Sequence, residues 1–282
     1  MDQPVQRYKL RISYRGTKYY GWQTQGLSID WKGTLLPDGS QPPTIQVICR
    51  RAIEKVVGHH VKLVGSSRTD SGVHAKGQVA TFDTHMTNIP IEGLRRAVNS
   101  RLPPDIVIGT IEPCAAGFDV IRHTDRKRYQ YVIWNAPDPS PFFGELAFHR
   151  WQPLDLAAMS DAAGQLQGEH DFNAFAKPGH GRLNTVRTVH ECSVHGRGPK
   201  VVIGVTGSGF LWNMVRIIAG TLVEVGSGRF KPEDIGPMLR SRDRALTGST
   251  APAHGLYLQW VRFKVEQNTP LGGDHDQQSQ NS

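Results

Sequence analysis

The sequence predicts an α+β protein of two similar lobes, each with a largely antiparallel sheet flanked by helices. Strands and helices follow in the order strand, helix, strand, strand, helix, strand, and roughly the same order returns in the second half. The connections between them are short and hairpin-like, which favours antiparallel pairing over a doubly wound parallel sheet. The length of 282 residues is sufficient for two lobes.

The first lobe is expected over residues 1–114. Hydrophobic periodicity and turn residues predict strands over 8–14, 61–64, 73–84 and 105–111 and helices over 44–58 and 91–101. The first helix has the clearest pattern, because its apolar residues recur with the helical period. Thr44 can cap this helix, and Gly58 can end it in the left-handed conformation. Residues 26–43 carry Gly, Pro, Asp and Ser without periodicity and predict a loop.

The second lobe is expected over residues 115–266, with the boundary at 113–117. Its pattern predicts strands near 129–134, 185–195, 200–206 and 255–265 and helices over 156–166, 211–225 and 232–241. The helix over 211–225 has a strong apolar stripe that begins at Leu211. Residues 267–282 are rich in Gly, Gln, Asp, Asn and Ser and predict a disordered tail.

Charge and composition narrow the class of protein. Lys and Arg number 33 against 25 Asp and Glu, a net charge of +8, which favours a polyanionic partner through phosphate neutralisation. No apolar run is long enough to span a membrane and the N-terminus lacks the pattern of a secretory signal, so a cytoplasmic protein is expected. The spacing of the 3 Cys and 12 His residues matches no common metal motif, so no metal site is expected.

The most unusual segment is the polar loop over 65–75, Gly-Ser-Ser-Arg-Thr-Asp-Ser-Gly-Val-His-Ala, between two apolar stretches. Phosphate-loop, dinucleotide-binding and nucleophile-elbow motifs are absent from the sequence. Arg68 precedes Asp70 by two residues and can keep its carboxylate ionised, which suits a nucleophile or a base. The alternative from spacing alone is a β-turn in which Asp70 bonds local backbone amides.

This loop closely resembles the signature GRTDAGVHA-x-GQV-xx-F of the tRNA pseudouridine synthase A (TruA) family. Other segments resemble family motifs in the same order: 14–25, 44–46, 128–131, 168–175, 209–220 and 251–258. The ordered set spans about residues 8–265 and is therefore specific. The chain departs from the family at Ser67 (usually Gly), Ser71 (usually Ala), Lys127 (commonly Arg) and 118–121, where the family has F-x-A-R.

The resemblance implies a pseudouridine synthase-like fold with an active-site cleft between the lobes. It implies an isomerase that converts uridine to pseudouridine in the anticodon stem-loop of tRNA, at the family's positions 38, 39 and 40, without cofactor or metal. The partners it implies are tRNA and a second copy of the chain, rather than DNA or a membrane. Asp70 would be the nucleophile, attacking either the ribose C1′ or the base C6.

The same resemblance assigns roles to three further residues. Arg68 would hold the place of the flipped-out nucleotide and pair with phosphate or with Asp70. Tyr129 would stack on the uracil and serve proton transfer at C5, and Arg216 would pair with Asp70. Without the resemblance, each residue has an ordinary structural interpretation. Arg68 would form a loop ion pair, Tyr129 would be a tyrosine packed in the sheet, and Arg216 would be a solvated helix arginine. The arginines expected to contact phosphates are Arg50, Arg51, Arg122, Arg126 and Arg128.

Two alternatives remain open. One is a catalytically silent RNA-binding protein that keeps the fold and the charge. The other is a metal-dependent nuclease that uses Asp70, Asp83 and His74, although their spacing is not that of clustered metal ligands.

Overall fold

The computed structural model describes residues 5–23, 43–179 and 181–264. The helices are α1 (Ile45–Val57), α2 (Ile91–Asn99), α3 (Leu156–Gln165), α4 (Met214–Gly226) and α5 (Ile235–Ser241). The strands are β1 (Gln6–Tyr14), β2 (Val64–Gly65), β3 (His74–Thr84), β4 (Ile106–Cys114), β5 (Thr124–Asn135), β6 (Phe148–Arg150), β7 (Gly168–Asp171), β8 (Val186–Arg197), β9 (Lys200–Gly207) and β10 (Leu256–Phe263). The predicted tail and, apart from residue 43, the predicted loop lie outside the described residues.

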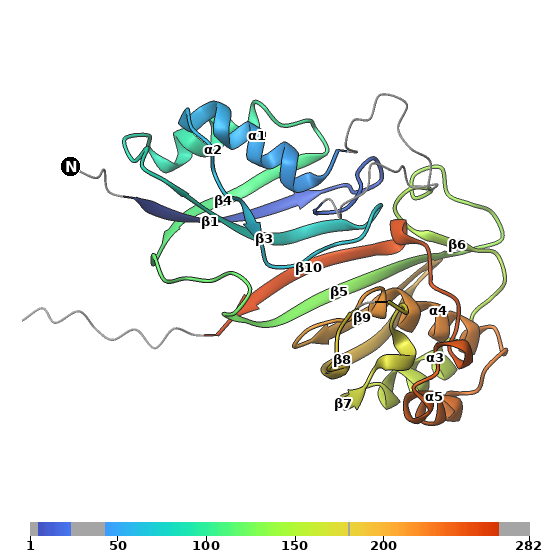
Figure 1. Ribbon diagram of the computed structural model, residues 1–282. Helices are drawn as coiled ribbons and strands as arrows, with labels where there is room; N and C mark the ends of the chain where they lie inside the picture. Colours follow the sequence, from blue (N-terminus) through green and yellow to red (C-terminus); the bar gives the residue numbers. More distant parts are fainter. Residues whose placement is uncertain (1–4, 24–42, 180, 265–282) are drawn as a thin grey trace, which may run out of the picture.

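One mixed sheet organises the molecule, in the strand order β4-β1-β3-β10-β5-β9-β8-β7, with β2 beside β3 and β6 beside β5. Most neighbours are antiparallel, while β10 runs parallel to β3 and β6 parallel to β5. The predicted α+β class, with a sheet flanked by helices, is therefore confirmed. The last strand, β10, lies between β3 and β5 and joins the two expected sheets into one (Figure 1). The division into lobes at residue 115 stays a prediction.

Helix α1 follows its predicted boundaries closely. The Thr44 side chain accepts a hydrogen bond from the backbone N–H of Val47 at 3.4 Å, and Gly58 ends the helix with φ of 76°. The buried side is formed by members of the apolar stripe, Ile45, Cys49, Ala52 and Ile53, together with Val57. Local signals were sufficient here because both caps and the apolar stripe lie within one short segment.

Helix α4 begins three residues later than predicted. Its apolar stripe continues back to Leu211, but Asn213 has φ of 60°, which is left-handed and cannot belong to a right-handed helix. Residues 211–213 therefore form a separate turn ahead of Met214. Hydrophobic periodicity does not detect such a backbone reversal.

In the described parts of the chain, no helix has the length and apolarity needed to cross a membrane.

Close packing of α4 depends on Gly220. A Cβ atom at this position would lie 1.8 Å from the carbonyl oxygen of Ser249, so the segment after α5 packs directly on the helix backbone. We expect Gly220→Ala to destabilise the fold by about 2 kcal/mol or more, since backbone must move to admit the methyl group. For a chain of this size the melting temperature should fall by roughly 4 °C or more, measured by thermal unfolding.

The matched control for this substitution is Gly164→Ala. Gly164 also lies in a helix, α3, but a Cβ atom there would meet nothing within 4 Å. Alanine is the better helix former by about 1 kcal/mol, so the control should be neutral or slightly stabilising. Equal melting temperatures for the two variants would contradict the packing argument.

Candidate active site

A pocket of about 480 Å³ opens where the polar loop over 65–75, called the Asp70 loop below, meets β5 and the start of α4. Its walls come from residues 65–70, from Lys127 and Tyr129 on β5, and from residues 210–216. Gly179, Arg182 and Leu256 are among the other lining residues. This space, called the Asp70 pocket below, contains all four residues expected to be catalytic: Arg68, Asp70, Tyr129 and Arg216.

Hydrogen bonds from neighbouring segments hold the Asp70 loop. The carbonyl of Thr69 accepts from the backbone N–H of Trp22 at 3.1 Å, and the Gln78 amide donates to the carbonyl of Ser67 at 2.7 Å. Gly72 turns the chain with φ of 78°, a conformation that glycine adopts without strain. The loop is therefore held by neighbouring segments as well as by its own turn bond, from the backbone N–H of Val73 to the carbonyl of Asp70 at 3.2 Å.

The Asp70 carboxylate is partly withdrawn from solvent, with 26% of its side chain exposed. Burial raises the pKa of Asp70 above its ordinary value because the charged form loses solvation. Three groups oppose this effect: the charge and hydrogen bonding of Arg216, a hydrogen bond from the Trp212 indole N–H, and the charge of Lys177. The carboxylate is thus poorly hydrated yet surrounded by groups that favour its ionised form.

Arg216 pairs with Asp70, with Nη1 at 3.6 Å from Oδ2. Its Nε donates to the carbonyl of Ala251 at 2.8 Å, and Nη1 also donates to Oδ1 of Asn213 at 3.2 Å. Its side chain is 17% exposed. These bonds direct the guanidinium into the pocket, so Arg216 is not a solvated helix arginine.

Tyr129 is packed in the floor of the pocket and 6% exposed. Its ring meets Phe210 edge to face, with centroids 5.2 Å apart, and its hydroxyl is 2.9 Å from the Ser67 hydroxyl. Burial raises the pKa of Tyr129 to about 12, so the phenol stays protonated at neutral pH. Ser67, one of the departures from the family pattern, therefore contacts an expected catalytic residue directly.

Basic side chains surround the pocket. Arg68 is exposed at its edge, and its side chain has no hydrogen bond or ion pair with the described residues. Lys127 is half-buried, and its amine donates to the carbonyl of Ser66 at 2.6 Å. Burial lowers the pKa of Lys127 to about 8. Among the described residues Lys127 has no carboxylate partner, and a cation held in this way suits a site that receives a phosphate.

The five arginines expected to contact phosphates do not line the Asp70 pocket. Arg126 and Arg128 alternate with Lys127 and Tyr129 on β5 and so project from the opposite face of the sheet. There Arg126 pairs with Asp125 at 2.7 Å, and Arg128 pairs with a glutamate, Glu191. Their contact with RNA stays a prediction.

The other three arginines lie farther along the surface. Arg122 is exposed and 3.8 Å from Asp119. Arg50 pairs with Glu54 at 3.1 Å on α1, and Arg51 is exposed on the same helix. No geometry ties these side chains to Asp70, so their role as phosphate contacts also stays a prediction.

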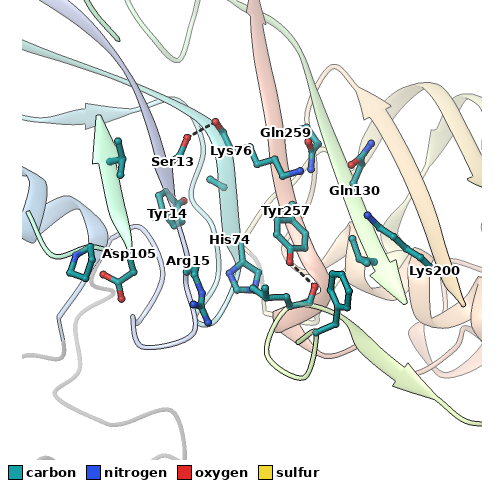
Figure 2. A pocket seen from close by; sticks show the side chains of 16 residues that line it. Ser13, Tyr14, Arg15, His74, Lys76, Asp105, Gln130, Lys200, Tyr257 and Gln259 are labelled. Carbon is teal, nitrogen blue, oxygen red and sulfur yellow. Dashed lines mark hydrogen bonds between the residues drawn. The ribbon is translucent and has the colours of Figure 1, made fainter. Parts of the chain in front are cut away.

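Figure 2 shows the residues that line a second pocket, of about 430 Å³. The alternation of side chains along β5 and β10 places it on the face of the sheet opposite the Asp70 pocket. Gln130 and Tyr257 line it, next in sequence to Tyr129 and Leu256 of the Asp70 pocket. His74 stacks on Tyr257 with centroids 4.7 Å apart and bonds backbone on both sides, accepting from the N–H of Gly16 at 2.9 Å. Burial lowers the pKa of His74, so it is a neutral structural link between strand ends.

The three residues that a metal-dependent nuclease would use as ligands, Asp70, Asp83 and His74, do not lie together. His74 faces the second pocket, and Asp83 pairs with Arg7 at 2.7 Å, away from Asp70. Over residues 5–23, 43–179 and 181–264 there is no group of three or more His, Cys, Asp or Glu side chains that could hold a metal ion.

Trp212, Lys177 and Arg182 belong to the site but were not singled out from the sequence. Trp212 and Arg182 line the Asp70 pocket, and Lys177 lies close enough to influence the pKa of Asp70. Trp212 could have been found from its place in the motif that contains Arg216. The segment containing Lys177 and Arg182 gave no signal, because its approach to Asp70 depends on tertiary structure.

Comparisons with known proteins identify the family to which the chain is similar. A family model described as tRNA pseudouridine synthase matches residues 32–121 and 162–264. A tRNA pseudouridine synthase A from Thermoanaerobacter sp. (strain X514) is 40% identical over 88% of this chain and 95% of its own length. Proteins named tRNA pseudouridine synthase A 2 from Clostridium perfringens and Clostridium tetani are 41% and 43% identical, covering 92% and 89% of this chain and 100% and 96% of their own lengths.

Among solved structures, a chain from the crystal structure of a Cbf5-Nop10-Gar1 complex aligns with 80% of this chain and 55% of its own length. The identity is 11% and the TM-score 0.29, so this likeness carries no argument.

Proposed function

This chain belongs to the tRNA pseudouridine synthase A family, and we propose that Asp70 is the residue with which it isomerises uridine to pseudouridine in tRNA. One observation carries the assignment to Asp70. It is a poorly hydrated carboxylate, beside the Arg216 guanidinium, in a pocket whose volume suits a single nucleoside. Such a carboxylate can attack a carbon atom without first shedding a full hydration shell.

The reaction moves the ribose C1′ bond of uracil from N1 to C5. Both schemes need the ionised form of Asp70. If Asp70 attacks C1′, an ester forms as the C1′–N1 bond breaks; if Asp70 adds to C6, the C1′–N1 bond breaks in the adduct. The base then turns over and C5 bonds to C1′, while the bond from Asp70 to C1′ or C6 breaks and frees the carboxylate. The hydrogen of C5 leaves as a proton. Tyr129, in the pocket floor, is proposed to stack on the uracil and to serve this proton transfer. No step requires a cofactor or a metal.

The target uridine has to leave its stack to reach Asp70, which costs a few kcal/mol. Arg68, exposed at the edge of the pocket, is proposed to occupy the vacated place or to pair with a phosphate. The basic side chains around the pocket would offset part of the cost by phosphate contact.

The finer assignments also belong to the proposal. The target is proposed to be the anticodon stem-loop at the family's positions, and the enzyme a cytoplasmic homodimer whose two subunits contact one tRNA. The solution mass tests the dimer, since the mass of a single chain at working concentration would remove it.

The function is tested by tritium release from tRNA labelled with [5-³H]uridine. Formation of the bond from C5 to C1′ expels the hydrogen of C5, so the wild-type protein should release tritium from tRNA. The release should be unchanged in a chelator. No release from any tRNA, with binding intact, would favour the silent RNA-binding protein, and loss of activity in chelator would reopen the metal-dependent alternative.

A further inference from the structure

Trp212 presents an unusual surface in the Asp70 pocket. Its indole is 38% exposed, although burying so large an aromatic side chain is favourable. The ring lines the pocket close to Asp70, and its N–H is among the groups that oppose the rise in the pKa of that carboxyl. An aromatic ring left open to solvent at this point is available to a ligand.

The indole is held in place from several sides. The Lys177 amine lies 4.3 Å from the ring centroid, a cation–π contact. The backbone N–H of Lys177 also donates to the carbonyl of Trp212 at 2.9 Å. The next residue, Asn213, has φ of 60°, a left-handed conformation that is uncommon outside glycine and is often found at functional sites. Trp212 is therefore a fixed platform rather than a mobile surface side chain.

A flat aromatic face with a cation beside it, in a basic pocket, matches the chemistry of a nucleobase and its phosphate. Stacking of bases on aromatic side chains is the common mode of single-strand RNA recognition. Tyr129 lies in the floor at 6% exposure, whereas Trp212 is far more open to solvent. A base on Trp212 would therefore lie nearer the mouth of the pocket than the target uracil.

We propose that Trp212, held by Lys177, stacks on the base of a nucleotide directly adjacent to the target uridine. This inference rests on the proposed function, because it assumes that a single uridine enters the pocket. It makes Trp212 a substrate-positioning residue. The competing role is purely structural, in which the indole N–H orients Asp70 and touches no RNA.

Two substitutions separate these roles. Trp212→Phe keeps an aromatic face but loses the N–H, whereas Trp212→Ala loses both. Stacking predicts that Trp212→Ala weakens tRNA binding roughly 5- to 150-fold while Trp212→Phe keeps most of the affinity. Binding would be measured as Kd for unmodified tRNA in the Asp70→Asn background, where turnover does not interfere. Trp151→Ala is the matched control, since Trp151 is 64% exposed outside the pocket and should bind as its parent does.

Synthetic anticodon stem-loop RNA identifies the stacked base. An abasic ribose directly 5′ or 3′ of the target uridine should weaken binding to the parent protein at one of these positions and have no further effect with Trp212→Ala. Unchanged affinity of Trp212→Ala would overturn the proposal, as would equal losses of kcat in both Trp212 variants with binding intact. Failure of the proposed function is distinguishable, because it removes tritium release from the wild-type protein whatever the binding results.

Discussion

Asp70→Asn is expected to lower tritium release from labelled tRNA by at least about a thousandfold, as removal of a catalytic nucleophile commonly does. The amide has nearly the shape of the carboxylate and keeps one oxygen that can accept from Arg216. It cannot ionise, however, and so cannot attack carbon in either scheme. The affinity for tRNA should change little, because RNA binding rests mainly on phosphate contacts and stacking.

Asp83→Asn is the matched control for this substitution. Asp83 lies on β3, the strand that follows the Asp70 loop, and it pairs with Arg7 at 2.7 Å outside the pocket. The control should keep its tritium release because the partly exposed ion pair contributes little. If Asp70→Asn released tritium at the rate of the control, the assignment of Asp70 as the nucleophile would be wrong.

Asp70→Asn should also raise the stability of the folded protein at neutral pH. The folded-state pKa of Asp70 lies above its unfolded value because of burial, so the folded protein binds more protons between these two values. Stability is therefore lost as pH rises from the unfolded pKa through the folded pKa, and it stays lower above both. Asparagine carries no charge to desolvate. Its gain in melting temperature at pH 7 should vanish below about pH 4, where Asp70 is protonated in both states.

Local patterns were sufficient for most of the fold. The caps and apolar stripe of α1 and the alternation along β1 lie within single segments, where the physics of capping and burial acts on neighbours in sequence. The place of β10 could not be derived in this way. It pairs with β3 in one half and β5 in the other, and no local periodicity indicates which distant strands will accept its hydrogen bonds.

In the candidate site, too, local sequence predicts some residues, whereas others depend on tertiary structure. Arg68 and Asp70 are close in sequence, so their shared pocket follows from one loop. Arg216 was expected in the site only because of the family resemblance. The structure places it beside Asp70 because hydrogen bonds to Ala251 and Asn213 direct its side chain. Residues 126–128 are all basic, so their charge does not indicate which side chain faces the pocket. Successive side chains on a strand point to opposite faces of the sheet, and of these three only Lys127 lines the pocket.

Arg216→Met is expected to lower tritium release at neutral pH by about 100-fold or more, the size of loss seen when one preorganised charged or polar group is removed from a buried site. The guanidinium is the largest of the influences that oppose burial and favour the ionised carboxylate of Asp70. Methionine fills similar space but leaves the desolvation unopposed. The pKa of Asp70 should therefore rise further in the variant.

This shift gives Arg216→Met a signature in the pH profile. Activity that needs ionised Asp70 rises with pH through the pKa of that group, so the acid limb of kcat should move to higher pH in Arg216→Met. Arg216→Lys should move it less, because it keeps the charge without the geometry of the guanidinium. Arg95→Met, which removes a half-buried arginine paired with Glu92 on α2, should leave the limb in place. An acid limb unmoved in Arg216→Met would mean that Arg216 acts on RNA or on packing rather than on the charge of Asp70.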